Sequence, residues 1–152
     1  MKGFIRTLCT VGAVALFLAA CGGPESVPEE ELRAWVDDGI DAATAKERRR
    51  LMSMVSPAYA DARGNERSEI ENMLRAYFFR QHKIALLSNI EEITVYDDTA
   101  ARIVLTVGMA GTNDGVLGFS ADAYRFALEL EKDADEWLLI SARWGELGNE
   151  LK

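Results

Sequence analysis

Residues 68–82 read Ser-Glu-Ile-Glu-Asn-Met-Leu-Arg-Ala-Tyr-Phe-Phe-Arg-Gln-His, and they end where the hydrophobic periodicity of the chain changes. Ser68 and Glu71 have the spacing of a capping box, in which two side chains satisfy free N–H groups at a helix start. Apolar residues then recur at helical spacing, at Ile70, Met73, Leu74, Tyr77 and Phe78. The pattern predicts an amphipathic helix over about residues 67–81.

After His82 the apolar residues alternate with a period of two, which is typical of strands with one buried face. Alternating stretches run over residues 93–96, 102–109, 124–131 and 138–144. In the last stretch, the residues predicted to face the core are Leu138, Ile140, Ala142 and Trp144. Turn-forming residues separate the stretches at 97–98, 113–115 and 133–136. Strands joined by turns after a run of helices predict an α+β fold, with an antiparallel sheet covered on one face.

Two further helices are expected before residue 67. Ser26 and Glu29 have capping-box spacing, and Pro28 lies in the first turn, where its missing N–H costs nothing. One apolar stripe follows at Leu32, Trp35, Val36, Ile40 and Ala43. A second helical stretch carries Leu51, Met52 and Val55 and ends at Ser56-Pro57. A polar connector over residues 59–65 then leads to the helix at 67–81.

The N-terminus has a different composition from the rest of the chain. Lys2 and Arg6 are the only charges before Glu25, and residues 8–20 are mostly apolar. This stretch ends in Leu18-Ala19-Ala20-Cys21, which resembles the lipobox of bacterial lipoproteins. The resemblance implies that residues 1–20 are a cleaved signal peptide and that Cys21 carries lipid. The alternative is a retained transmembrane helix, but the uncharged stretch is barely long enough and contains glycine and proline.

We expect residues 21–28 to be the lipidated Cys with a flexible tether, and residues 29–152 to be one domain. Removal of residues 1–20 takes away two basic residues and no acid, so 15 basic and 25 acidic residues remain, a net charge of −10. Cys9 leaves with the signal peptide and Cys21 carries lipid, so the mature domain has no disulfide and no Cys ligand or nucleophile. In bacterial lipoproteins Asp after the lipidated Cys is the usual inner-membrane signal. Gly22 at that position implies an outer-membrane lipoprotein that faces the periplasm.

The order of elements resembles the nuclear transport factor 2-like superfamily, also called SnoaL-like or cystatin-like. The resemblance covers about residues 29–146 and rests on the paired-helix start, the turn at 59–64, the helix ending in Ala76-Tyr77-Phe78 and the last strand over 137–144. It implies a cone, in which N-terminal helices pack into a strongly curved antiparallel sheet. The superfamily holds dehydratases, isomerases and non-catalytic binding domains, so this fold implies no single function.

Composition and motifs exclude several classes of function. The net charge of −8 and a pI near 4.7 disfavour a nucleic-acid partner. With one His and no usable Cys, no metal site is predicted. The glycines fit neither a P-loop nor G-x-G-x-x-G, and Gly118-Phe119-Ser120-Ala121-Asp122 is not a nucleophile elbow, so we predict no cofactor.

Three residues are candidates for acid–base chemistry. His82 follows the helix at 67–81, where an imidazole can transfer protons or simply complement the helix dipole. Tyr59 and Asp61 lie in the polar connector and could either reach a cavity mouth or satisfy backbone groups. Five aromatic residues could line an apolar pocket or form core: Trp35, Tyr77, Phe78, Phe126 and Trp144.

These features predict a lipoprotein of the cell envelope that binds a small apolar ligand or a protein partner without catalysis. The first alternative is a small dehydratase- or isomerase-type enzyme that uses His82 with Asp61 or Tyr59 inside the cone. The second is a dimerising interaction domain that uses the outer face of the sheet.

Overall fold

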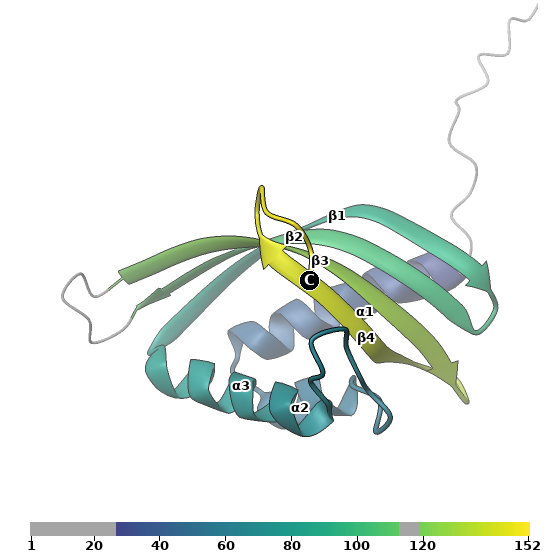
Figure 1. The fold of residues 1–152 in the computed structure, drawn as a ribbon, viewed down its shortest axis with the longest axis horizontal. Coiled ribbons are helices and arrows are strands. Elements are labelled where there is room, and N and C mark those ends of the chain that lie inside the picture. Colours follow the sequence, from purple (N-terminus) through teal and green to yellow (C-terminus); the bar gives the residue numbers. More distant parts are fainter. Residues whose placement is uncertain (1–26, 113–118) are drawn as a thin grey trace, which may run out of the picture.

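Three helices precede four strands in the computed structural model, which describes residues 27–112 and 119–152 (Figure 1). The helices are α1 (Val27–Thr44), α2 (Arg48–Ser53) and α3 (Arg67–Arg80). The strands are β1 (Lys83–Asp97), β2 (Ala100–Thr112), β3 (Phe119–Asp133) and β4 (Glu136–Glu146). The predicted α+β class, with helices followed by strands, is therefore confirmed.

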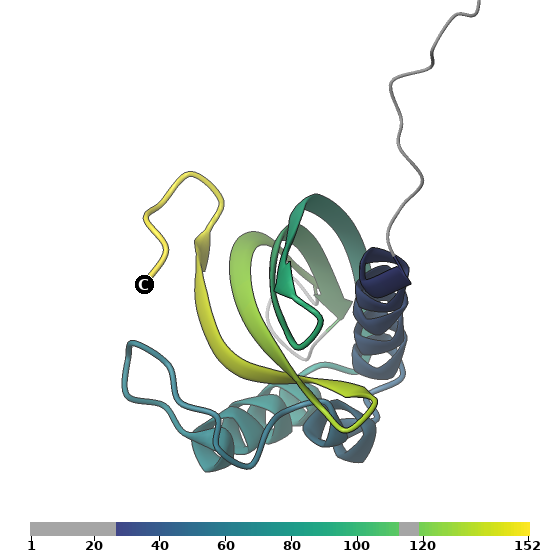
Figure 2. The ribbon, with the colours of Figure 1, turned by 90° about the vertical axis from the view of Figure 1, so that its right-hand side faces the viewer.

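The strands form one antiparallel sheet in the order β1-β2-β3-β4, and the sheet curves strongly around the helices (Figure 2). Three residues stand outside the pairing register, Glu91 and Tyr96 in β1 and Ile140 in β4. An extra residue in one strand of an antiparallel pair is a β-bulge, which bends the strand and increases its twist. The bulges contribute to the predicted cone, whose concave face covers the helices.

Because β4 contains a bulge, the prediction of which β4 residues face the core was wrong in the first half of the strand. Leu138 and Ile140 were expected to share the inner face with Ala142 and Trp144. Instead, Trp137 is 5% exposed and lies in the core, and Leu139 packs against the buried residues Met52, Val55 and Tyr59. The extra residue Ile140 then shifts the alternation, so that Ala142 and Trp144 return to the inner face.

The core consists of two neighbouring clusters under the concave face. In the first, α1 packs Leu32 and Val36 against β2 residues such as Ile103, as its predicted apolar stripe requires. In the second, Met52 and Val55 pack against β4. Trp35 belongs to the first cluster, where its indole N–H donates to the Trp137 carbonyl oxygen at 2.9 Å.

The capping box of α3 lies two residues earlier than predicted. Glu66 and Glu69 form it, rather than Ser68 and Glu71. The Ser68 hydroxyl instead donates to the Glu69 carboxylate at 3.0 Å. A Glu at the cap position can accept the same backbone bond as Ser, so the two spacings compete in this sequence.

The predicted signal peptide, Cys21, most of the tether and the Ser26 cap lie outside the described residues. Within residues 27–112 and 119–152, no helix has the length and apolar character that a membrane crossing demands.

Candidate functional site

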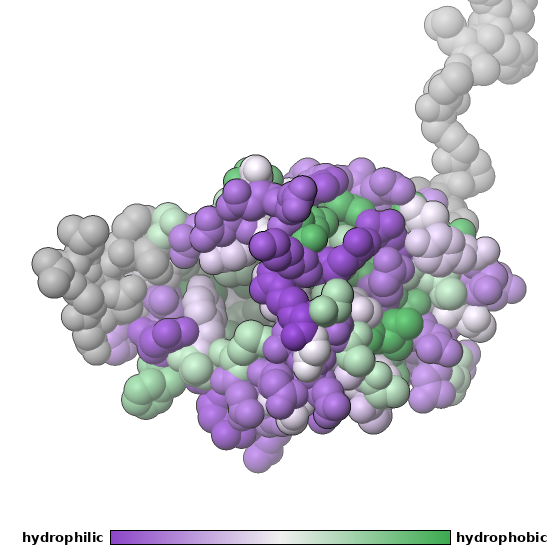
Figure 3. All heavy atoms as spheres, viewed as in Figure 1, coloured by the Kyte–Doolittle hydropathy of each residue, from purple (hydrophilic) through white to green (hydrophobic). Residues whose placement is uncertain are grey.

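A cavity of about 560 Å³ lies between α3 and the concave face of the sheet. We call it the cone cavity. Figure 3 shows a hollow between the sheet above and α3 below. The cone cavity is lined by residues of α3 (Ile70, Met73, Leu74, Ala76, Tyr77, Phe78, Arg80), of the strands (Ile84, Leu86, Met109, Tyr124, Phe126, Leu128, Leu139, Ala142, Trp144) and by Ala43 and Tyr59.

Helical and strand periodicity place these side chains. On α3, lining residues follow the three- and four-residue spacing of one helix face. On β3, the lining residues Tyr124, Phe126 and Leu128 alternate, and the bulge in β4 brings Trp144 to the same wall. Three α3 residues of the wall, Met73, Ala76 and Arg80, are exposed, so the cavity opens along this side of α3.

The wall offers little acid–base chemistry. Among the described residues that line the cone cavity, Arg80 carries the one charge, and the other polar groups are the hydroxyls of Tyr59, Tyr77 and Tyr124 and the indole N–H of Trp144. Burial is the largest cause that raises the pKa of each of these tyrosines. All three phenols therefore stay protonated near neutral pH, and those of Tyr77 and Tyr124 can serve as hydrogen-bond donors in the cavity wall.

The structure brings Tyr59 and Asp61 together. The Tyr59 hydroxyl donates to Asp61 Oδ2 at 3.2 Å, and Asp61 also accepts bonds from the backbone of Arg63 and from Asn65. Burial works against ionisation of Asp61, but the bonds from Asn65, Arg63 and Tyr59 outweigh it and lower its pKa. Asp61 therefore organises the connector as an anion and does not line the cone cavity.

His82 occupies a different place from these two residues. It is exposed after the end of α3, its backbone N–H donates to the Thr112 carbonyl oxygen at 2.7 Å, and it lines neither of the two cavities described in this section. Four of the five aromatic candidates, Tyr77, Phe78, Phe126 and Trp144, do line the cone cavity. Trp35 lies instead in the core beside Trp137.

Asp122 is a carboxylate that the sequence analysis did not single out as a site residue. It lies two residues before Tyr124 on β3 and pairs in register with Met109, so it shares the face of the sheet that lines the cavity. After burial, the charge of Asp122 is the next cause that raises the pKa of both Tyr77 and Tyr124. The alternation of β3 was the signal in the sequence that could have found it.

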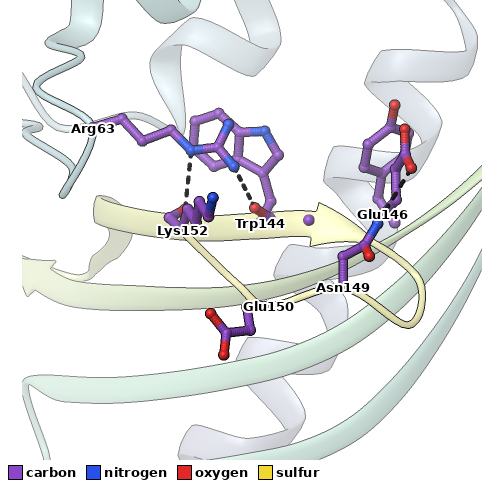
Figure 4. Close-up of a pocket in the computed structure, with 8 residues that line it drawn as sticks. Arg63, Trp144, Glu146, Asn149, Glu150 and Lys152 are labelled. Atoms are coloured by element: carbon purple, nitrogen blue, oxygen red, sulfur yellow. Dashed lines mark hydrogen bonds between the residues drawn. The ribbon is translucent and has the colours of Figure 1, made fainter.

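A second, open cavity of about 620 Å³ adjoins the cone cavity. We call it the polar cleft, and Figure 4 shows the residues around it. It is lined by Arg63, Tyr124, Trp144, Gly145, Glu146, Asn149, Glu150 and Lys152. After β4 the chain turns back along this strand, and the backbone N–H of Trp144 donates to the main-chain oxygen of Lys152 at 3.2 Å. No group of three or more His, Cys, Asp or Glu residues in 27–112 and 119–152 could hold a metal ion.

No protein-family model matches the sequence, and no curated protein sequence matches it significantly. Among solved structures, a ketosteroid isomerase-like protein from Erwinia carotovora atroseptica is similar, with a TM-score of 0.65 and 12% identity over 79% of this chain and 96% of that protein. A candidate scytalone dehydratase from Novosphingobium aromaticivorans has a TM-score of 0.72 and 11% identity over 83% of this chain and 87% of that protein.

An NTF-2 like protein of unknown function from Shewanella oneidensis has a TM-score of 0.60 and 15% identity over 76% of this chain and 97% of that protein. At these identities the likeness concerns the fold. The curved sheet, the helices inside it and these neighbours together show that the chain has the nuclear transport factor 2-like cone fold.

Proposed function

We propose that the protein binds a small apolar ligand in the cone cavity without chemical conversion. The observation that carries the proposal is the wall itself, in which apolar and aromatic side chains surround about 560 Å³ and Arg80 is the one charged residue among those described. This volume is within the usual range of small-molecule sites, of roughly 300–1,000 Å³, and a few convergent polar groups suffice to orient a ligand. The phenols of Tyr77 and Tyr124 supply such groups.

A substitution that fills the mouth of the cone cavity tests this proposal. Ala76 lines the cavity but is exposed, so Ala76→Trp adds a large side chain there without overpacking the core. We expect at least tenfold weaker binding of the neutral fluorescent probe N-phenyl-1-naphthylamine. The matched control is Ala34→Trp, at an exposed position of α1 outside the cavity wall. Absence of probe binding by the unsubstituted protein would contradict the proposal.

Proton transfer is the second candidate function. It is favoured by Asp122, an exposed carboxylate that shares the inner face of β3 with Tyr124 and whose charge acts on the phenols of Tyr77 and Tyr124. Neighbours named as an isomerase-like protein and a candidate dehydratase share the fold. In deuterium oxide, an enzyme of this type would exchange the α-protons of a ketosteroid probe, and Asp122→Asn would abolish the exchange. If the α-protons exchange no faster with the protein than in buffer alone, proton transfer is contradicted and ligand binding remains the proposed function.

We further propose that the chain is a lipoprotein anchored through Cys21 in the outer membrane, facing the periplasm. The support is the sequence Leu18-Ala19-Ala20-Cys21 after a basic, apolar start. Cys21→Ser should move the protein from the membrane fraction to the soluble fraction, since several acyl chains give stable attachment and their loss removes it. Cys9→Ser is the control and should stay in the membrane fraction. Membrane retention of Cys21→Ser would contradict lipid anchoring.

A further inference from the structure

The cone cavity and the polar cleft have two lining residues in common. Tyr124 and Trp144 line both of them, so the apolar space and the polar space adjoin across these two aromatic side chains. The two spaces differ in chemistry. Arg80 is the one charged side chain among the described residues of the cone cavity, whereas Arg63, Glu146, Glu150 and Lys152 bring charges of both signs to the cleft. A ligand that extends past these rings would pass from apolar surroundings to charged ones.

Arg63 is held firmly at this boundary. Its Nη2 donates to the Trp144 carbonyl oxygen at 2.6 Å, and its Nε donates to the main-chain oxygen of Lys152, the last residue of the sequence, at 3.2 Å. The guanidinium carbon lies 4.3 Å from the centre of the Trp144 ring. Its backbone N–H also donates to Asp61, which fixes the connector that carries it. The guanidinium is therefore pre-positioned, and a ligand that binds it need not order it first.

The same guanidinium keeps binding capacity. An arginine has five N–H donors, and the two bonds to main-chain oxygens leave the remaining donors without an acceptor among the described residues. Within those residues, no Asp or Glu side chain lies at ion-pair distance from Arg63, in contrast to Arg48, Arg50 and Arg125, which each pair with one. Figure 4 shows Arg63 and Lys152 on the Trp144 side of the cleft, with Glu150 turned away from them.

We propose that the natural ligand is an amphiphile with an anionic head group, a carboxylate, which Arg63 binds in the polar cleft while its apolar part occupies the cone cavity. This inference rests on the proposed binding function and names the class of ligand. The remaining guanidinium donors suit a carboxylate, whose two oxygens can accept charge-assisted hydrogen bonds from one arginine. Lys152 adds a second positive charge to the same side of the cleft.

The test compares three ligands of equal chain length: decanoate, decanol and decylamine. Each competes below its micelle concentration with N-phenyl-1-naphthylamine for the full chain carrying Cys21→Ser, so that no acyl group of the protein takes up the probe. We expect decanoate to bind about tenfold more tightly than decylamine. Arg63→Gln should weaken decanoate binding about tenfold and leave decanol binding unchanged.

Two further variants and the affinity for the probe show whether a change in decanoate binding reflects the head-group site or a loss of structure. Lys152→Gln keeps the main-chain bonds of this residue and should weaken decanoate binding two- to threefold. Arg143→Gln lies on the same strand as Trp144 but outside both cavity walls, and it should change nothing. An unchanged probe affinity in Arg63→Gln shows that the cone cavity is intact.

The outcomes separate this inference from the proposed function. If decanol and decanoate both bind, but decanoate loses affinity only in Arg80→Gln, the head group binds at the mouth of the cone cavity, which overturns the role of Arg63. Equal affinity for decanoate and decylamine also overturns it. If neither the probe nor decanol binds the unsubstituted protein, the proposed function itself fails.

Discussion

Tyr59 joins the wall of the cone cavity to the connector that follows α2. Its side chain is 2% exposed, and its hydroxyl donates to Asp61 at 3.2 Å. Burial, and then the charge of Asp61, raise the pKa of Tyr59 far above its ordinary value. The hydroxyl therefore keeps its proton at neutral pH, so it acts as a donor that holds the connector and not as a base.

Tyr59→Phe should lower the free energy of unfolding by about 1 kcal/mol, because it removes one buried hydrogen bond and keeps the ring in the core. Urea denaturation measures this change, and the affinity for N-phenyl-1-naphthylamine should stay within about twofold. Tyr96→Phe, at an exposed position of β1, is the matched control and should leave stability unchanged. If Tyr59→Phe were as stable as the unsubstituted protein, the hydroxyl would not hold the connector.

The last segment of the chain depends on a close backbone approach to β4. A Cβ atom at Gly145 would lie 2.7 Å from the Glu150 carbonyl oxygen, a distance that real Cβ atoms essentially never show. Backbone cannot yield as a flexible side chain can. Gly145 therefore permits residues 149–152 to lie along β4 and to form one wall of the polar cleft.

Gly145→Ala should displace this segment from β4. The hydrogen bonds between Trp144 and Lys152 would break, so their amide protons should exchange with solvent at least tenfold faster. Hydrogen-exchange NMR measures both. The control is Gly108→Ala on β2, whose added Cβ would meet its nearest atom at 3.8 Å, an ordinary contact. Unchanged exchange in Gly145→Ala would mean that the segment can shift without losing its bonds.

Helices and strands were predictable to the extent that their signal is local. The apolar spacing at 70–78 and the alternation at 124–131 depend on neighbours in sequence, and both elements are found where expected. The bulges at Glu91 and Ile140 depend on how the sheet must curve around α1 and α3, and no local residue pattern marks them. This is why Leu138 and Ile140 were assigned to the core face, where Trp137 and Leu139 lie instead.

The residues of the candidate site were likewise predictable only where their signal is local in the sequence. Tyr77, Phe78, Phe126 and Trp144 follow from periodicity and do line the cone cavity. Arg63 lies more than 80 residues from Trp144 in the sequence, and only the turn of the chain after β4 brings them together. His82 was a candidate because it is the one His of the sequence and follows a helix, but it is exposed and lines neither cavity.

Two electrostatic effects act in opposite directions on the whole molecule as the pH falls. The net charge is −8 at pH 7, and its self-repulsion weakens as the pH approaches the pI near 4.7. Against this, the pKa values of Glu31, Asp61, Glu69, Glu91 and Asp97 are all lowered in the folded state, so these groups favour folding as anions. Since folded pKa values lie below the unfolded ones, this stabilisation is complete above the unfolded values and is lost as the pH falls through the folded values.

We therefore expect the melting temperature to be highest near pH 5–6 and to fall steeply below about pH 4. Glu31 is the residue with which to check the cause, because its carboxylate accepts bonds from Lys132 at 2.7 Å and from the Trp137 indole at 2.9 Å, and these two bonds, that from Lys132 first, lower its pKa. Glu31→Gln should be less stable at pH 6 and should lose less stability between pH 5 and pH 3. Glu136→Gln is the control, since Glu136 is exposed and forms no side-chain bond with any described residue. Parallel curves of stability against pH for Glu31→Gln and the unsubstituted protein would show that the contacts joining α1 to the hairpin of β3 and β4 do not depend on charge. The loss of stability in acid would then have to come from the carboxylates of the sheet and the connector.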